Sequence, residues 1–130
     1  MSFFGLHIIL DCYGGNNALF CDTEAITEYQ LEATRLCGMN VLFGPHNLVA
    51  KPVSEKDRGG VTGVTVISES HIAIHTFDER GFVMIDIATC KTDIPVDAIV
   101  AFTQEFFGFA EVEVTVVERG KKFGEYNPTI

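Results

Sequence analysis

Residues 61–89, VTGVTVISESHIAIHTFDERGFVMIDIAT, decide the fold of this 130-residue chain. Apolar and β-branched residues fill three runs, at about 61–68, 71–77 and 81–89, and polar residues or glycine separate them. Short apolar runs bounded by turn residues are typical of strands joined by short connections. The centre of the chain is therefore predicted to be three consecutive strands of one sheet.

The segments on either side of this centre predict two helices and three more strands. In chain order the expected elements are strand 3–12, helix 23–37, strand 41–53, loop 54–60, the three central strands, helix 93–107 and strand 111–118. Asp22 or Thr23 can cap the first helix, and Gly38 can take the left-handed position at its end. Pro45 and Pro52 disturb the interior of the second strand, because proline cannot donate to a sheet.

Two helices beside a mainly antiparallel sheet predict an α+β fold, a two-layer sandwich with both helices on one face. The length fits a single domain, 1–130, which would bury about two thirds of its unfolded surface. The other face of the sheet also carries Phe and Val, so a second copy is expected to cover it in a homodimer.

Composition excludes several classes of partner. A net charge of −9 argues against nucleic acid, which binds clustered Lys and Arg, and it weakly suits a cationic small molecule. No apolar run approaches the roughly 18 residues of a membrane span, and no secretory leader is apparent. Cys12, Cys21, Cys37 and Cys90 form no CxxC pair and no zinc-type spacing with the four histidines. We expect a reduced, cytoplasmic protein without a metal site or membrane contact.

Polar chemistry is concentrated where the first two central strands meet, at Glu69, Ser70, His71 and His75. One interpretation is an ordinary turn followed by two histidines on one face of a strand. The other makes Ser70 a nucleophile with an imidazole as its base. In one regular strand, residues 70 and 75 lie about 16 Å apart and on opposite faces. A direct contact would need a sharp bend at 68–71, or else the base acts on another group.

The run ISESHIAIHT (67–76), followed by Glu79, Gly81 and DIATC (86–90), resembles the short prokaryotic form of S-adenosylmethionine decarboxylase, a pyruvoyl enzyme. Weaker matches lie in GLH (5–7) with Asp11 and Tyr13, in GVTGV (60–64) and in VVERG (116–120). The resemblance covers most of the chain. It also points to paired copies with active sites at or near their interface.

The resemblance implies that the chain cuts itself between Glu69 and Ser70, giving a β chain, 1–69, and an α chain, 70–130. Ser70 would become a pyruvoyl group, the cofactor, whose ketone captures a substrate amine and withdraws electrons as carbon dioxide leaves. The product would be the aminopropyl donor for polyamine (spermidine) synthesis.

The same resemblance implies roles for five further residues. His75 matches a histidine that assists processing, and Thr62 stands where many relatives have a serine with a similar role. Cys90 matches the proton donor. Glu79 would hold the ribose hydroxyls, and Asp11 would bind or orient the substrate amine or sulfonium.

Departures from the family pattern leave the substrate open. Phe77 and Asp78 precede Glu79 and are expected to contact substrate, but many relatives have proline where this chain has Asp78. That extra carboxylate could pair with a guanidinium or a second ammonium. A pyruvoyl-dependent arginine or ornithine decarboxylase is therefore one alternative, and an uncleaved regulatory or binding homologue is another.

Overall fold

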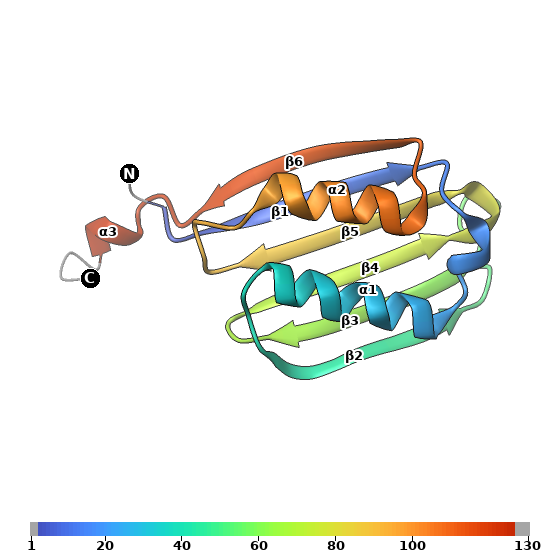
Figure 1. Cartoon of the computed structure of the whole chain (residues 1–130), viewed down its shortest axis with the longest axis horizontal. Coiled ribbons are helices and arrows are strands. Elements are labelled where there is room, and N and C mark those ends of the chain that lie inside the picture. The colour runs from blue at the N-terminus through green and yellow to red at the C-terminus, as the bar shows by residue number, and fades with distance from the viewer. Residues whose placement is uncertain (1–2, 127–130) are drawn as a thin grey trace.

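The computed structural model describes residues 3–126 (Figure 1). Its elements are β1 (Gly5–Tyr13), α1 (Thr23–Leu36), β2 (Val41–Ala50), β3 (Gly60–Ile67), β4 (Ser70–Phe77), β5 (Phe82–Thr89), α2 (Val96–Phe107), β6 (Glu111–Arg119) and α3 (Phe123–Tyr126), with short 3-10 turns η1 (Asn17–Leu19) and η2 (Asp78–Arg80). The eight predicted strands and helices are confirmed in their predicted order.

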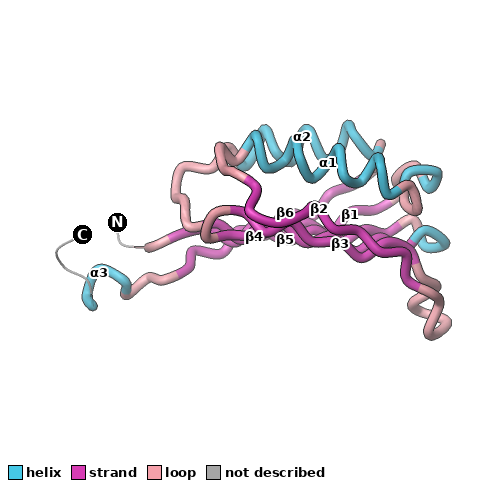
Figure 2. The backbone as a smooth tube through the Cα atoms, turned by 90° about the horizontal axis from the view of Figure 1, so that it is seen from below, coloured by secondary structure: helices cyan, strands magenta, loops and turns pink. Residues whose placement is uncertain are grey.

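One six-stranded sheet carries the fold, in the order β2-β3-β4-β5-β1-β6, and every neighbouring pair is antiparallel. Strands β3, β4 and β5 follow one another directly, whereas β1 lies between β5 and β6. Helices α1 and α2 cover one face (Figure 2). The predicted two-layer α+β sandwich is therefore confirmed.

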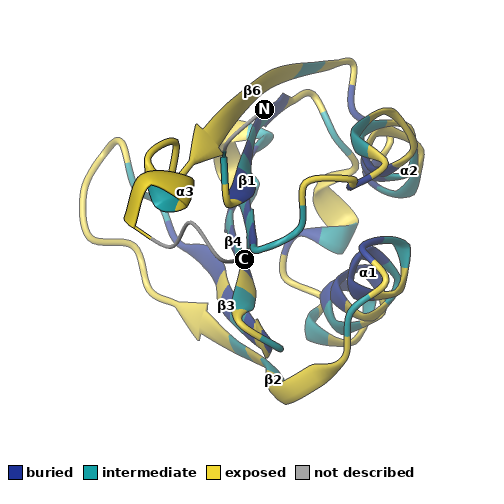
Figure 3. Cartoon of the chain, turned by 90° about the vertical axis from the view of Figure 1, so that its left-hand side faces the viewer, coloured by how far each residue is buried: buried dark blue, intermediate teal, exposed yellow. Residues whose placement is uncertain are grey.

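The core lies between the helices and the sheet, because alternate residues of each inner strand point toward α1 and α2. Leu10, Ile74 and Ile85 are fully buried there, against Tyr29 of α1 and Phe107 of α2. Viewed end on, the two helices lie together on one side of the sheet (Figure 3).

The opposite side of the sheet, the open face, carries the remaining side chains, which are half-buried or exposed. Strand register arranges them in four cross-strand rows: Val117–His7–Ala88–His71–Val66, Thr115–Ile9–Asp86–Ala73–Val64–His46, Glu113–Asp11–Met84–His75–Thr62–Leu48, and Glu111–Tyr13–Phe82–Phe77. The open face thus mixes apolar groups with four of the polar residues that the sequence singles out, Asp11, Thr62, His71 and His75.

Local chemistry explains the element boundaries. The Asp22 carboxylate accepts from the backbone N–H groups of Glu24 and Ala25 and so caps α1, as predicted. Gly38 has φ of +68°, the left-handed conformation expected after the helix. The second predicted strand was too long, because Val53 N donates to Asp57 O within a loop turn and β2 ends at Ala50.

The second helix begins three residues later than predicted, at Val96, where Pro95 is its N-cap residue. Helix α3 and the two 3-10 turns were not predicted, because segments this short carry no periodicity. Within residues 3–126 no helix is long and apolar enough to cross a membrane.

Candidate active site

A tight turn, Ser68–Glu69, joins β3 to β4, and Ile67 pairs with Ser70 across it. Glu69 has φ of +62° and is the one non-glycine residue with positive φ among residues 3–126. A side chain in this left-handed region costs about 1–2 kcal/mol, because its Cβ crowds the neighbouring carbonyl. The peptide bond between Glu69 and Ser70 therefore follows a strained residue.

Releasing this strain should slow any reaction that breaks the bond. We expect Glu69→Gly to slow self-cleavage by about fivefold or more, because about 1 kcal/mol of ground-state strain is removed. Glu69→Ala is the matched control, since it removes the carboxylate but keeps the Cβ. Urea unfolding in an uncut Ser70→Ala background should find the Gly chain more stable than the Ala chain. Equal cleavage rates and equal urea midpoints for the two variants would show that the strain has no role.

The Ser70 hydroxyl is held by the residue after β5. Its Oγ accepts a hydrogen bond from the backbone N–H of Cys90, at 3.1 Å. The β4–β5 register brings the two residues together, since His71 pairs with Ala88. Gly5 allows β1 to approach from the other side, because a Cβ there would lie only 2.1 Å from the carbonyl oxygen of Thr89 and 2.9 Å from Cys90 Cα. Two residues expected to act together, Ser70 and Cys90, are thus adjacent.

A cavity of about 390 Å³ opens at this end of the sheet, with Glu69, Ser70 and Cys90 in its wall. His71 and Arg119 also line this cavity, and the side chains of both belong to the open face. The volume suits a small molecule or part of one. A group at Ser70 would therefore be accessible to a ligand.

The four thiols differ in their surroundings. Burial, with the nearby Asp11 charge, raises the pKa of the Cys12 thiol to about 12, and burial raises that of Cys37 to about 11. Both are core residues and stay protonated and inaccessible. Cys21 is exposed beside Asp78, and only Cys90 lies in the wall of the Ser70 cavity.

His75 and Thr62 form a second pair of predicted residues in contact. They lie opposite each other in the β3–β4 register, with 3.3 Å between Thr62 Oγ1 and His75 Nδ1. His75 is five residues along β4 from Ser70 and on the opposite face, so the two are about 16 Å apart. The chain does bend at Ser68–Glu69, but the bend precedes Ser70 and leaves this separation unchanged.

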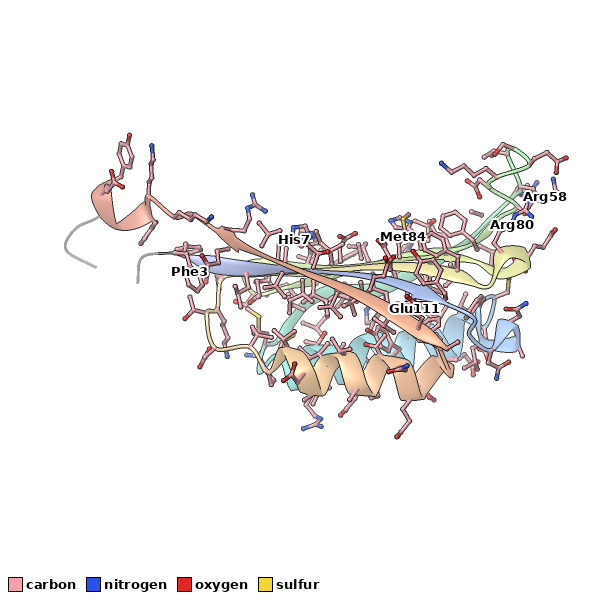
Figure 4. The ribbon with its side chains drawn as sticks, turned by 90° about the horizontal axis from the view of Figure 1, so that it is seen from above. Phe3, His7, Arg58, Arg80, Met84 and Glu111 are labelled. Atoms are coloured by element: carbon pink, nitrogen blue, oxygen red, sulfur yellow. The ribbon has the colours of Figure 1, made fainter. Side chains whose placement is uncertain are left out.

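Asp11 is placed in the row of His75 and Thr62, opposite Met84 and Glu113, rather than beside Ser70. The row next to Ser70 instead contains His7, whose Nε2 lies 3.3 Å from Asp86 Oδ1 without hydrogen-bond geometry. Figure 4 shows His7 and Met84 on the side of the sheet away from the helices. No role was predicted for His7, although its position in an alternating strand could have indicated this face.

Phe77, Asp78 and Glu79 lie at the other end of the sheet. The Phe77 ring stacks on Phe82 with 5.6 Å between centroids, and Phe82 in turn packs on Tyr13 at 5.3 Å. The three rings form an aromatic surface that was not predicted, although Phe77 and Phe82 flank one short turn.

Both carboxylates of η2 have partners. Asp78 Oδ2 accepts from the Cys21 thiol at 3.4 Å, and Glu79 Oε1 lies 3.5 Å from Arg58 Nε. A second cavity, of about 600 Å³, lies between this region and the loop that contains Arg58. Neither the ion pair between Arg58 and Glu79 nor this cavity was predicted.

These observations define the class of protein. It is an α+β sandwich in which a serine follows the turn between two strands and lies beside a cavity. A TM-score of 0.72 relates the fold to the crystal structure of the adenosylmethionine decarboxylase from Aquifex aeolicus VF5, at 24% identity over 92% of this chain and 93% of that chain. The S-adenosylmethionine decarboxylase family model matches residues 6–120.

Curated relatives agree with the family model. The S-adenosylmethionine decarboxylase proenzyme of Clostridium botulinum (strain Hall) is 34% identical over 121 residues, which are 93% of this chain and 98% of the relative. The proenzyme of the same name from Methanococcus maripaludis (strain C7) is 32% identical over 116 residues, 89% of each chain. The chain therefore belongs to the S-adenosylmethionine decarboxylase family.

Proposed function

We propose that the chain is a self-processing, pyruvoyl-dependent decarboxylase of S-adenosylmethionine, which supplies the aminopropyl donor for spermidine synthesis. One observation carries the proposal: Ser70 directly follows the strained Glu69, and the Cys90 N–H holds its hydroxyl oxygen. Relatives named as proenzymes support the same reading. The four free thiols suit the reducing cytoplasm, where we place the enzyme.

Self-cleavage would begin with attack of Ser70 Oγ on the carbonyl carbon of Glu69. The hydroxyl proton passes to a base, and the amide becomes an ester. Loss of the Ser70 Cα proton then breaks the Cβ–Oγ bond, and Oγ leaves as part of the new Glu69 carboxylate. Water replaces the Ser70 nitrogen, which departs as ammonia. The Cys90 N–H can donate to this oxygen as it changes from hydroxyl to carboxylate.

The residues around Ser70 fit a pyruvoyl group. The cavity of about 390 Å³ gives a ligand access to position 70, and the Cys90 side chain lines the same wall. The pyruvoyl ketone, once formed, supplies the electron-withdrawing carbonyl for decarboxylation. Cys90 is the proposed proton donor to the carbon that loses carbon dioxide.

The processing residues argue for a homodimer with a shared site. His75 and Thr62 cannot reach Ser70 within one chain, since about 16 Å separates them along the strands. The Ser70 cavity is also lined by His71 and Arg119 of the open face, so it can be approached from that side. Both lie on the open face, which also presents Val64, Met84 and Val117. A second copy packed on this face would bury those apolar groups and bring its own His75 toward Ser70.

Mass spectrometry of the denatured protein tests the proposal. We expect two fragments, 1–69 and 70–130, the second lighter by one ammonia than simple hydrolysis would make it. Carbon dioxide release should then be compared for S-adenosylmethionine, arginine and ornithine, with turnover expected for the nucleoside. An intact chain with unmodified Ser70 after days would overturn self-processing, and turnover of a basic amino acid instead would overturn the substrate.

A further inference from the structure

The loop between β2 and β3, residues 51–59, folds over the open face near η2 and is called the flap. Figures 2 and 4 show it rising from the sheet on the side opposite α1 and α2. Asp57 organises it: its carbonyl accepts from Val53 N and Ser54 N, and its carboxylate accepts from Gly59 N at 3.0 Å. Ser54 Oγ accepts from Asp57 N at 2.9 Å. The flap is therefore a folded unit rather than an extended loop.

Two arginines fasten the flap to η2. Arg58, within the flap, reaches Glu79, with 3.5 Å between Nε and Oε1. Arg80, within η2, donates from Nη2 to the backbone carbonyl of Glu55 in the flap. The contacts run in opposite directions, one from each element, so together they fix the position of the flap.

The fastened flap makes one wall of the cavity of about 600 Å³. Lys56 and Asp57 of the flap face Phe77, Phe82 and Met84 of the sheet, and Arg80 lies in the wall between them. The volume lies within the range of sites for small molecules. Stacked aromatic rings on one side and polar groups on the other suit a flat heteroaromatic ring.

We propose that Arg58 is a positioning residue for the nucleoside part of a substrate whose amine reacts at position 70 of the second copy in the proposed dimer; this rests on the proposed function. Arg58 closes the flap over the aromatic surface and orients the Glu79 carboxylate. Its contact is with Oε1, which leaves Oε2 for a ribose hydroxyl. The base would lie in the cavity between Asp57 of the flap and Phe77. The cavity exists while the contact is made, so the closed flap forms the site rather than blocking it.

Substitution of Arg58 tests this role. We expect Arg58→Ala to raise KM for S-adenosylmethionine by about fivefold at low salt, with kcat and self-cleavage changed by less than about twofold. Arg58→Lys should recover part of the loss. High salt should raise the wild-type KM by a larger factor than that of Arg58→Ala, because the pair is partly exposed, with side chains 35% and 57% accessible.

Arg35→Ala is the matched control, since Arg35 also pairs with a glutamate, Glu32, but lies on α1. It should behave as wild type. A chain in which Arg58→Ala leaves KM unchanged, or lowers kcat with KM constant, would overturn the role of Arg58. Combining Arg58→Ala with Glu79→Gln should add little to the effect of Glu79→Gln, because both remove the same contact.

Failure of the proposed function would be separately visible. If the wild-type chain decarboxylates S-adenosylmethionine and Arg58→Ala has the same KM as wild type, only this inference is overturned. A wild-type chain that neither cuts itself nor decarboxylates overturns the proposed function. Calorimetric titration of 5′-methylthioadenosine into uncut Ser70→Ala, with and without Arg58→Ala, then decides the inference: weaker binding without Arg58 supports it, and equal affinity overturns it.

Discussion

Chains carrying Ser70→Ala will stay uncut and release no carbon dioxide, and co-expression with His75→Ala chains will restore both reactions at about a quarter of the sites. Neither variant alone has a complete site. In a mixed dimer, Ser70 of one chain meets His75 of the other, whereas the second site of that dimer lacks both. Random pairing in equal amounts makes about half of the dimers mixed, which gives the quarter.

The Ser70→Ala and His75→Ala chains should carry tags of different mass, so that the fragments of each chain can be told apart. Denaturing mass spectrometry should find cut products only from the His75→Ala chain. Ser68→Ala is the matched control for Ser70→Ala, since it removes a hydroxyl two residues earlier, in the turn before β4, and that chain should cut itself. If the mixture stays as uncut as the separate variants, the two residues do not act across a dimer.

Cys90→Ala should separate the two reactions. We expect self-cleavage to continue, because the backbone N–H that holds Ser70 Oγ is unchanged by the substitution. Turnover should fall by about a hundredfold to ten-thousandfold, the usual effect of removing a positioned proton donor. The two quantities are measured on one sample, as the fraction of cut chain and as carbon dioxide release per cut chain.

Cys21→Ala is the control for Cys90→Ala, because Cys21 is the exposed thiol at the other end of the sheet. It should leave both reactions near wild type. Undiminished turnover in Cys90→Ala would make Cys90 a packing residue. Loss of cutting as well as turnover would place the thiol in processing rather than in decarboxylation.

The order of the elements could be predicted from the sequence because apolar residues recur at every second position in the strands and at every third or fourth position in the helices. Alternation in β1 and β6, and the Asp22 and Gly38 caps of α1, are local signals that needed no tertiary information. The end of β2 was misplaced because loop hydrogen bonds to Asp57 set it, and the start of α2 was misplaced because the N-cap at Pro95 sets it.

The site was only partly predictable for a physical reason. The pairs Ser70–Cys90 and Thr62–His75 follow from strand register. The alternation of a strand fixes which face a residue takes, but it does not say which residue of the neighbouring strand lies opposite. The contact between Arg58 and Glu79 joins residues 21 positions apart through a loop fold that has no periodic signal. Asp11 was assigned by resemblance, and only the register showed that it lies with His75 rather than with Ser70.

The position of β1 in the sheet determines how the two fragments would stay associated after self-cleavage. A cut at the β3–β4 turn assigns β1, α1, β2 and β3 to one piece and β4, β5, α2 and β6 to the other. Strand β1 of the first piece lies between β5 and β6 of the second, so the two pieces share one sheet. Three ladders, β3 with β4, β1 with β5 and β1 with β6, would have to open before they could part. The nicked protein would thus hold together with no covalent link between its halves.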